Sequence, residues 1–293
     1  MQLLGYKERA VCSKAFAYMI LIIFFIILLF PIYWIVTIST KEMVDMFSVP
    51  PKFVYKATLR HFRELFYGGG VKRIAAGTFL FSLINSFKVS ILSVAITAVI
   101  GIPAAYSIAK FNYKGKAAIS MWILTVLMLP PVVAIMPLLW LYKEIGKRAL
   151  MMYDTWHGLV IANMIFLVPF FIWILRGFFL EIPKDIEEAA RVDGCSQLQA
   201  FIRISLPLVV PGISMSVILC VILSWNTFFF PFMLAGKNTM TAPVSITGFI
   251  SFEEISWGKL AASGLVMMLP PVILAFFFQK AIVRGLTFGA VKG

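Results

Sequence analysis

Long apolar stretches alternate with short polar ones along this chain of 293 residues. A membrane-spanning helix needs roughly 20 mostly apolar residues to cross a hydrocarbon layer ~30 Å thick. Six uncharged runs meet this requirement, at about residues 15–38, 89–109, 117–142, 155–175, 208–235 and 260–279. They lack the alternation of barrel strands, and backbone in lipid must satisfy its own hydrogen bonds. The pattern therefore predicts an all-α membrane protein, with six transmembrane helices in a single domain over 1–293.

A polar, helix-forming segment separates the fourth and fifth apolar runs. Pro183 suits the first turn of a helix whose acidic residues gather at its N-terminal end, where the helix dipole favours them. Gly194 can take the left-handed conformation that ends such a helix. Ser196 and Gln199 have the spacing of a capping box, which would open a second short helix that Pro207 ends. The sequence predicts a helix-turn-helix arm outside the membrane.

Composition agrees with a membrane protein, because 61% of the residues are hydrophobic and only 13% are charged. The mean hydropathy is +0.95. The first apolar run is too long for the core of a signal peptide and has no obvious small-residue cleavage site. We therefore expect it to be a retained span.

The arm contains a motif that resembles a known one. The cytoplasmic coupling loop of binding-protein-dependent ABC importer permeases has a characteristic sequence: Glu-Ala-Ala, three residues, glycine, nine residues and then Ile-x-Leu-Pro. The matching residues, with the aspartate before the glycine, are Glu188, Ala189, Ala190, Asp193, Gly194, Ile204, Leu206 and Pro207. The resemblance implies that residues 183–206 couple this chain to an ATPase.

The wider chain is similar to the six-span carbohydrate permeases of the maltose-permease type, through Asp193 and the run Trp225-Asn226-Thr227-Phe228. Cys195 stands where that family usually has alanine, and Thr227 where an acidic residue is common. The resemblance implies a type I ABC importer permease fold in the bacterial cytoplasmic (inner) membrane. It also implies a heterodimer with a second permease subunit, two ATP-binding subunits that hold ATP and Mg, and an extracytoplasmic sugar-binding protein.

Lysine and arginine predict the orientation of the spans. With the N-terminus in the cytoplasm, 13 of the 26 basic residues lie inside. When the long loop 41–88 is set aside, 13 remain inside against 5 outside. Both termini and the arm are then cytoplasmic. This bias, with contact to anionic lipid, accounts for the net charge of +13, and the dispersed basic residues do not favour nucleic-acid binding.

Several other activities lack their sequence signals. The chain has no G-x-x-x-x-G-K-[ST] loop, so an ATPase must be a separate chain and we expect no cofactor on this one. The histidines His61 and His157 are isolated, and no metal-ligand spacing occurs. All 13 acidic residues fall outside the predicted spans, which argues against a proton- or sodium-coupled carrier. No Ser-His or paired-aspartate arrangement within the spans suggests a hydrolase.

Polar residues within the spans are the candidates for a substrate pathway. Asn226, Trp225 and Asn163 offer amide groups and an aromatic face, which suit the hydroxyl edges and C–H faces of a sugar. An interhelical hydrogen bond is the alternative role for the amides. The outer basic residues Lys143, Lys147 and Arg148 would accommodate an acidic oligosaccharide such as an alginate or pectin fragment.

Two proline pairs stand in similar contexts, Met128-Leu129-Pro130-Pro131 and Met268-Leu269-Pro270-Pro271. Proline breaks the helical hydrogen-bond ladder, so both pairs indicate bends that could articulate a pathway. The alternative is that two proline-containing helices resemble each other by chance, since membrane helices tolerate proline.

The most consistent function is a sugar permease subunit. A permease for another solute and a membrane scaffold without a transport path are the alternatives.

Overall fold

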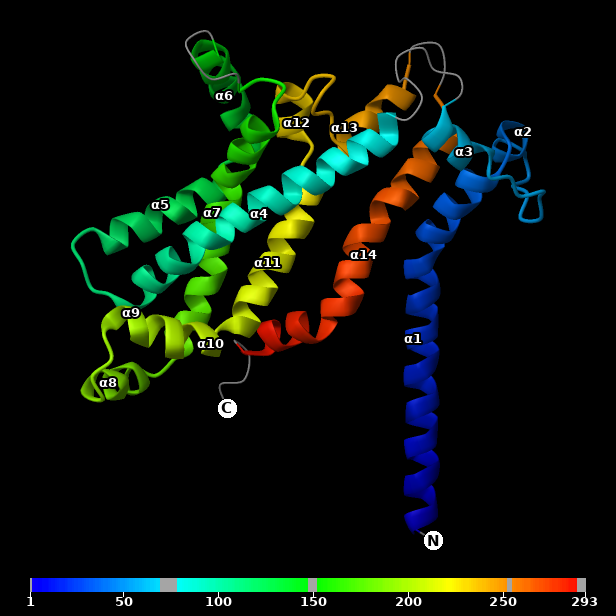
Figure 1. Cartoon of the computed structure of the whole chain (residues 1–293). Coiled ribbons are helices and arrows are strands. Elements are labelled where there is room, and N and C mark those ends of the chain that lie inside the picture. The colour runs from blue at the N-terminus through cyan, green and yellow to red at the C-terminus, as the bar shows by residue number, and fades with distance from the viewer. Residues whose placement is uncertain (1, 69–77, 147–151, 252–254, 289–293) are drawn as a thin grey trace. The chain divides into compact units, whose positions relative to one another are not determined.

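The computed structural model describes residues 2–68, 78–146, 152–251 and 255–288, which are predominantly helical (Figure 1). Outside the helices, the only β-type pairing among them is an isolated bridge between Ile250 and Ile255. The α-helices are α1 (Gln2–Thr40), α2 (Met43–Met46), α3 (Arg60–Tyr67), α4 (Thr78–Lys110), α5 (Lys116–Met128), α6 (Pro131–Gly146), α7 (Trp156–Glu181), α8 (Lys184–Val192), α9 (Gln197–Ala200), α10 (Leu206–Leu208), α11 (Val210–Trp225), α12 (Phe229–Leu234), α13 (Ala242–Ser245) and α14 (Trp257–Phe288). A π-helical turn, Phe201–Ser205, joins α9 to α10, and a 3-10 turn, Ile246–Phe249, follows α13.

Four helices among the described residues are long and apolar enough to cross a membrane, in α1, α4, α7 and α14. Two further pairs qualify only when taken together across a bend. These are α5 with α6, bent by 98°, and the run 197–208 with α11, bent by 71°. The predicted all-α membrane fold is confirmed, and six crossings result if each bent pair is one span.

The helices differ from the predicted runs where charge or proline was used to place a boundary. Helix α4 begins at Thr78 and continues through Lys88, whose ammonium group lies 4.0 Å from the ring centroid of Trp156. Predicted run 117–142 is divided at Leu129, before Pro130, as the proline pair indicated. The second pair, Pro270 and Pro271, lies within α14, which continues through it without interruption.

The chain forms two compact units, and α4, α7 and α11 make the core of the larger one, built from residues 78–248 and 267–293. Phe171, Leu175 and Phe179 of α7 are fully buried among apolar side chains of α4 and α11. In lipid the hydrophobic effect does not drive helices together, because the hydrocarbon is as apolar as the side chains. Close packing of this kind holds them together instead. The core therefore gives the bundle a rigid centre.

The loops at the start of α7 in this unit are tied together by one carboxylate. Asp154, at a φ of 52°, accepts hydrogen bonds from the backbone N–H groups of Gly236, Asn238 and Thr239 and from the Thr239 hydroxyl at 2.7 Å. Burial alone would raise the pKa of Asp154, but the hydrogen bonds from Thr239 and the three N–H groups outweigh it and lower the pKa. This stabilisation is therefore complete above the ordinary pKa of an aspartate, about 3.9, and is lost as the pH falls through the lowered pKa.

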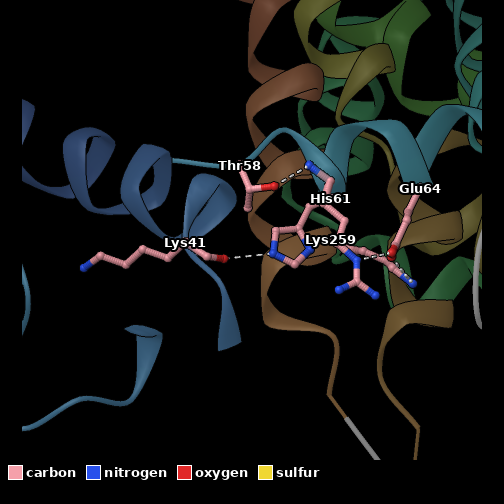
Figure 2. Close-up of polar contacts among 6 residues, drawn as sticks. Lys41, Thr58, His61, Glu64 and Lys259 are labelled. Carbon is pink, nitrogen blue, oxygen red and sulfur yellow. Dashed lines mark hydrogen bonds and ion pairs between the residues drawn. The ribbon is translucent and has the colours of Figure 1, made fainter. Parts of the chain in front are cut away.

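The smaller unit contains residues up to 77 and 249–266. Figure 2 shows its polar contacts: Glu64 of α3 pairs with Lys259 of α14 at 3.2 Å, and His61 lies 2.9 Å from the Lys41 carbonyl oxygen. Burial would raise the pKa of Glu64, but hydrogen bonds from Arg60 and Lys259 lower it overall. These contacts join α3 to the first turn of α14. Every side chain from residue 16 to residue 30 of α1 is exposed, and this apolar surface suits a membrane.

Candidate functional site: the arm and the bundle cavity

The first half of the arm is helix α8, which ends in a Schellman motif. Gly194 has a φ of +90°, as its sequence position predicts. The N–H of Cys195 donates to the Ala190 carbonyl oxygen at 2.9 Å, and the N–H of Gly194 donates to the Arg191 carbonyl oxygen at 3.1 Å. These two bonds satisfy carbonyl groups that the helix end would leave unpaired. The turn is thus fixed by local backbone chemistry.

The second half of the arm opens with the predicted capping box. The Ser196 hydroxyl accepts from the N–H of Gln199 at 3.3 Å, and the Gln199 side-chain oxygen accepts from the N–H of Ser196 at 2.8 Å. The expectation that Pro207 ends this helix is wrong. Pro207 lies within the helical run 197–208, in α10, and this run bends at Val209 instead.

The predicted coupling residues divide into an exposed and an inward-facing set. Glu188, Ala189, Asp193 and Pro207 are exposed, whereas Ala190 is buried. Ile204 and Leu206 are half-buried, and Gly194 is exposed at the turn. The exposed side of the arm includes an open hollow of about 500 Å³. Its lining residues are Glu188, Arg191, Val192, Cys195, Ser196 and Gln197. The arm therefore presents both charged and apolar groups, since Val192 is 88% exposed.

Glu187, whose place in the sequence does not distinguish it from its exposed acidic neighbours, is the buried acid of the arm. The Ser205 hydroxyl donates to its Oε1 at 2.6 Å, and the Tyr106 hydroxyl approaches its Oε2 at 3.5 Å. The Lys110 ammonium group lies 3.6 Å from Oε1. A signal was present, because Glu187 and Ala190 are one helical turn apart and so share the inward face. The charge of Glu187, taken alone, favours a position on the solvent-exposed face of the helix.

A second site is an open pocket of the bundle, whose lining includes the exposed Asn226. A cavity of about 290 Å³ brings Asn163 of α7 together with Asn226 at the end of α11. Its other lining residues are Leu127, Pro131, Phe166, Leu167, Phe170, Leu223, Thr227, Phe228, Phe229 and Phe230. The amide of Asn163 donates to the Ser224 hydroxyl at 3.1 Å, and that of Asn226 donates to the Ile222 carbonyl oxygen of its own helix at 2.8 Å. The cavity thus combines aromatic surface with two amides and no charged lining residue.

The remaining candidates lie elsewhere. Trp225 is buried, donates from its ring N–H to the Met267 carbonyl oxygen at 3.1 Å and contacts Phe87, so it does not line the cavity. Lys143 is exposed on α6. Lys147 and Arg148 are outside the described residues. The three cations proposed for an acidic sugar are therefore not brought to the cavity by the part of the chain that is described.

Comparison with known proteins agrees with this architecture. Residues 98–288 match the family described as "Binding-protein-dependent transport system inner membrane component". The trehalose transport system permease protein SugB of Mycobacterium tuberculosis is 35% identical over 271 residues, which cover 90% of this chain and 93% of SugB. The trehalose/maltose transport system permease protein MalG of Thermococcus litoralis is 33% identical, over 92% of this chain and 93% of MalG.

A solved structure shares the fold. A chain of the bacterial ABC transporter that imports the acidic polysaccharide alginate superposes with a TM-score of 0.69 at 20% identity, over 89% of this chain and 92% of that one. The type I importer permease fold that the family resemblance implied is thereby confirmed. This chain belongs to the family of binding-protein-dependent transport system inner membrane components and is a multi-pass permease of the ABC transporter class.

Proposed function

We propose that this chain is one permease subunit of an ATP-driven importer for a neutral oligosaccharide. The observation that supports this most is the exposed arm, whose Schellman turn and capping box leave Glu188 and Asp193 at the surface, as docking to an ATP-binding subunit requires. The partners would be a second permease subunit, two ATP-binding subunits that hold ATP and Mg, and an extracytoplasmic binding protein. This chain would supply the pathway and no ATPase site of its own.

The bundle cavity and the relatives support carbohydrate as the substrate class. Amides beside aromatic rings match the hydroxyl edges and C–H faces of a sugar. The uncharged lining fits a neutral sugar better than a uronate, because an unpaired carboxylate in an apolar site costs several kcal/mol or more. Two of the relatives are named for trehalose or maltose transport.

Reconstitution tests this function. The chain is co-expressed with its partner permease, ATPase and binding protein, and the complex is placed in liposomes. We expect ATP-dependent accumulation of a neutral oligosaccharide, and ATP hydrolysis that rises when the loaded binding protein is added. Hydrolysis that never responds to the binding protein would favour a scaffold role, and accumulation of a non-sugar solute alone would assign another substrate.

Orientation is tested with a membrane-impermeant thiol reagent in a Cys12→Ser background. We propose cytoplasmic termini, a cytoplasmic arm and an outward loop 235–241. Native Cys195, which is partly exposed, should react only after the membrane is permeabilised. A cysteine introduced at exposed Lys237 should react in intact cells. Labelling of Cys195 in sealed cells would reverse the orientation.

The pathway is tested at Asn226. Asn226→Leu removes an amide from the cavity without breaking a contact between helices, because that amide bonds only within α11 in the described contacts. Losing a hydrogen bond to a neutral sugar corresponds to about 0.5–1.5 kcal/mol, so transport efficiency should fall about two- to twelvefold. Ser214→Ala is the matched control, since its hydroxyl makes the same kind of intrahelical bond away from the cavity. Equal uptake kinetics in both variants would remove Asn226 from the pathway.

A further inference from the structure

Glu187 joins three parts of the chain at one point. Its own helix, α8, belongs to the arm, whereas Tyr106 and Lys110 belong to the last turns of α4. Ser205 lies at the end of the π-helical turn that leads towards α11. The carboxylate therefore receives groups from α4 and from the run that enters α11, in an interior where the Lys110 and Glu187 side chains are only 6% and 10% exposed.

Two partners of Glu187, Lys110 and Tyr106, make further contacts with residues in and beside the arm. The Lys110 ammonium group donates to the Ile182 carbonyl oxygen at 2.7 Å, just before α8 begins. Gln197 of α9 donates to the Tyr106 hydroxyl at 2.9 Å. The Tyr106 ring in turn packs against Phe201 and Phe179, with centroids 4.5 and 5.4 Å away. Both helices of the arm are thus bonded to the same end of α4.

We propose that Glu187 is a positioning residue which makes the arm and the cytoplasmic end of α4 move as one body during transport. This inference rests on the proposed function, in which an ATPase displaces the arm. A buried ion pair is a poor means of gaining stability, because its desolvation costs about as much as its attraction returns. It is a good means of fixing orientation, because removing one partner leaves an uncompensated charge and only one geometry satisfies all the donors. The arm's exposed acids, such as Glu188, do not make these inward contacts.

The test separates coupling from stability in the reconstituted complex. Glu187→Gln keeps the shape of the side chain and removes its charge, and Lys110→Met removes the opposing charge. We expect both complexes to co-purify with their ATPase and to hydrolyse ATP. The amount of sugar moved per ATP should fall on the order of tenfold, within the usual range of energetic coupling between sites. Asp185→Asn, an exposed acid on the same helix, is the matched control and should leave the ratio unchanged.

The exchanged pair, Glu187→Lys with Lys110→Glu, should recover most of the lost transport per ATP. A purely structural role would lower the yield of complex, or hydrolysis and uptake in parallel, with the ratio unchanged, and that result overturns the proposal. If the single variants do not accumulate, the double variant Ser205→Ala with Tyr106→Phe tests the proposal in their place. This pair removes two hydroxyl groups from the carboxylate and keeps both charges. It should lower the ratio about threefold, the loss of roughly one hydrogen bond of net free energy, and an unchanged ratio rejects the proposal.

Wild-type behaviour distinguishes this inference from the proposed function. A wild-type complex without ATP-driven uptake would contradict the function itself. Wild-type uptake together with unaltered ratios in the variants would contradict only the role of Glu187.

Discussion

Replacing Gly194 by valine should abolish ATP-driven uptake while the membrane-spanning helices remain folded. The φ of Gly194 is +90°, and no atom lies within 4 Å of the position that a Cβ would occupy. The cost of valine is therefore backbone strain and not a clash, of order 1–3 kcal/mol for a residue held outside its allowed region. Relief of that strain would open the turn between α8 and α9. Uptake and ATPase co-purification in membranes measure the effect.

Two further variants calibrate the Gly194 result. Gly194→Asn should retain part of the activity, because asparagine tolerates the left-handed region better than a β-branched residue does. Gly177→Ala in α7, where a Cβ also meets nothing within 4 Å, should behave as the wild type. A Gly194→Val complex that assembles and transports normally would show that the turn is not part of the coupling.

Replacing Gly158 by alanine should prevent the subunit from folding stably. A Cβ at Gly158 would overlap the carbonyl oxygen of Met152, a backbone atom that cannot rotate away. The surroundings are fixed as well. The Tyr142 hydroxyl donates to the Gly158 carbonyl oxygen at 2.7 Å, and the Thr155 hydroxyl accepts from the Gly158 N–H. We expect the free energy of unfolding to fall by an amount at or above the upper end of the ~1–3 kcal/mol typical of overpacking. Thermal unfolding in detergent measures this effect as a lower melting temperature. Gly264→Ala, at an open position in α14, is the control, and equal melting temperatures would refute the steric argument.

The turn of the arm and the capping box after it could be predicted because their signals are local. The left-handed conformation of Gly194 and the reciprocal bonds of Ser196 and Gln199 depend only on residues within one or two helical turns. The apolar runs were equally informative, since they depend on length and composition alone. Family resemblance and physical pattern therefore led to the same fold.

The interior contacts could not be predicted because their partners are distant in sequence. Lys88 was used as a boundary, yet its ammonium group over the Trp156 ring lets α4 continue through it. Glu187 was overlooked because its partners on α4 lie 77 and 81 positions earlier in the sequence. Trp225 was assigned to the pathway for its ring, whereas a long-range bond to the Met267 carbonyl oxygen fixes it elsewhere.

The buried contact between Glu187 and Lys110 limits how the arm can be exchanged between permeases. A chimera that receives only residues 183–206 from a relative would bring in one side of this contact, while the other side stays on α4. An incoming arm without an acid at position 187 would leave Lys110 buried beside no counter-charge. During evolution, positions 106, 110 and 187 should therefore change together, and a functional arm transplant should include the last two turns of α4.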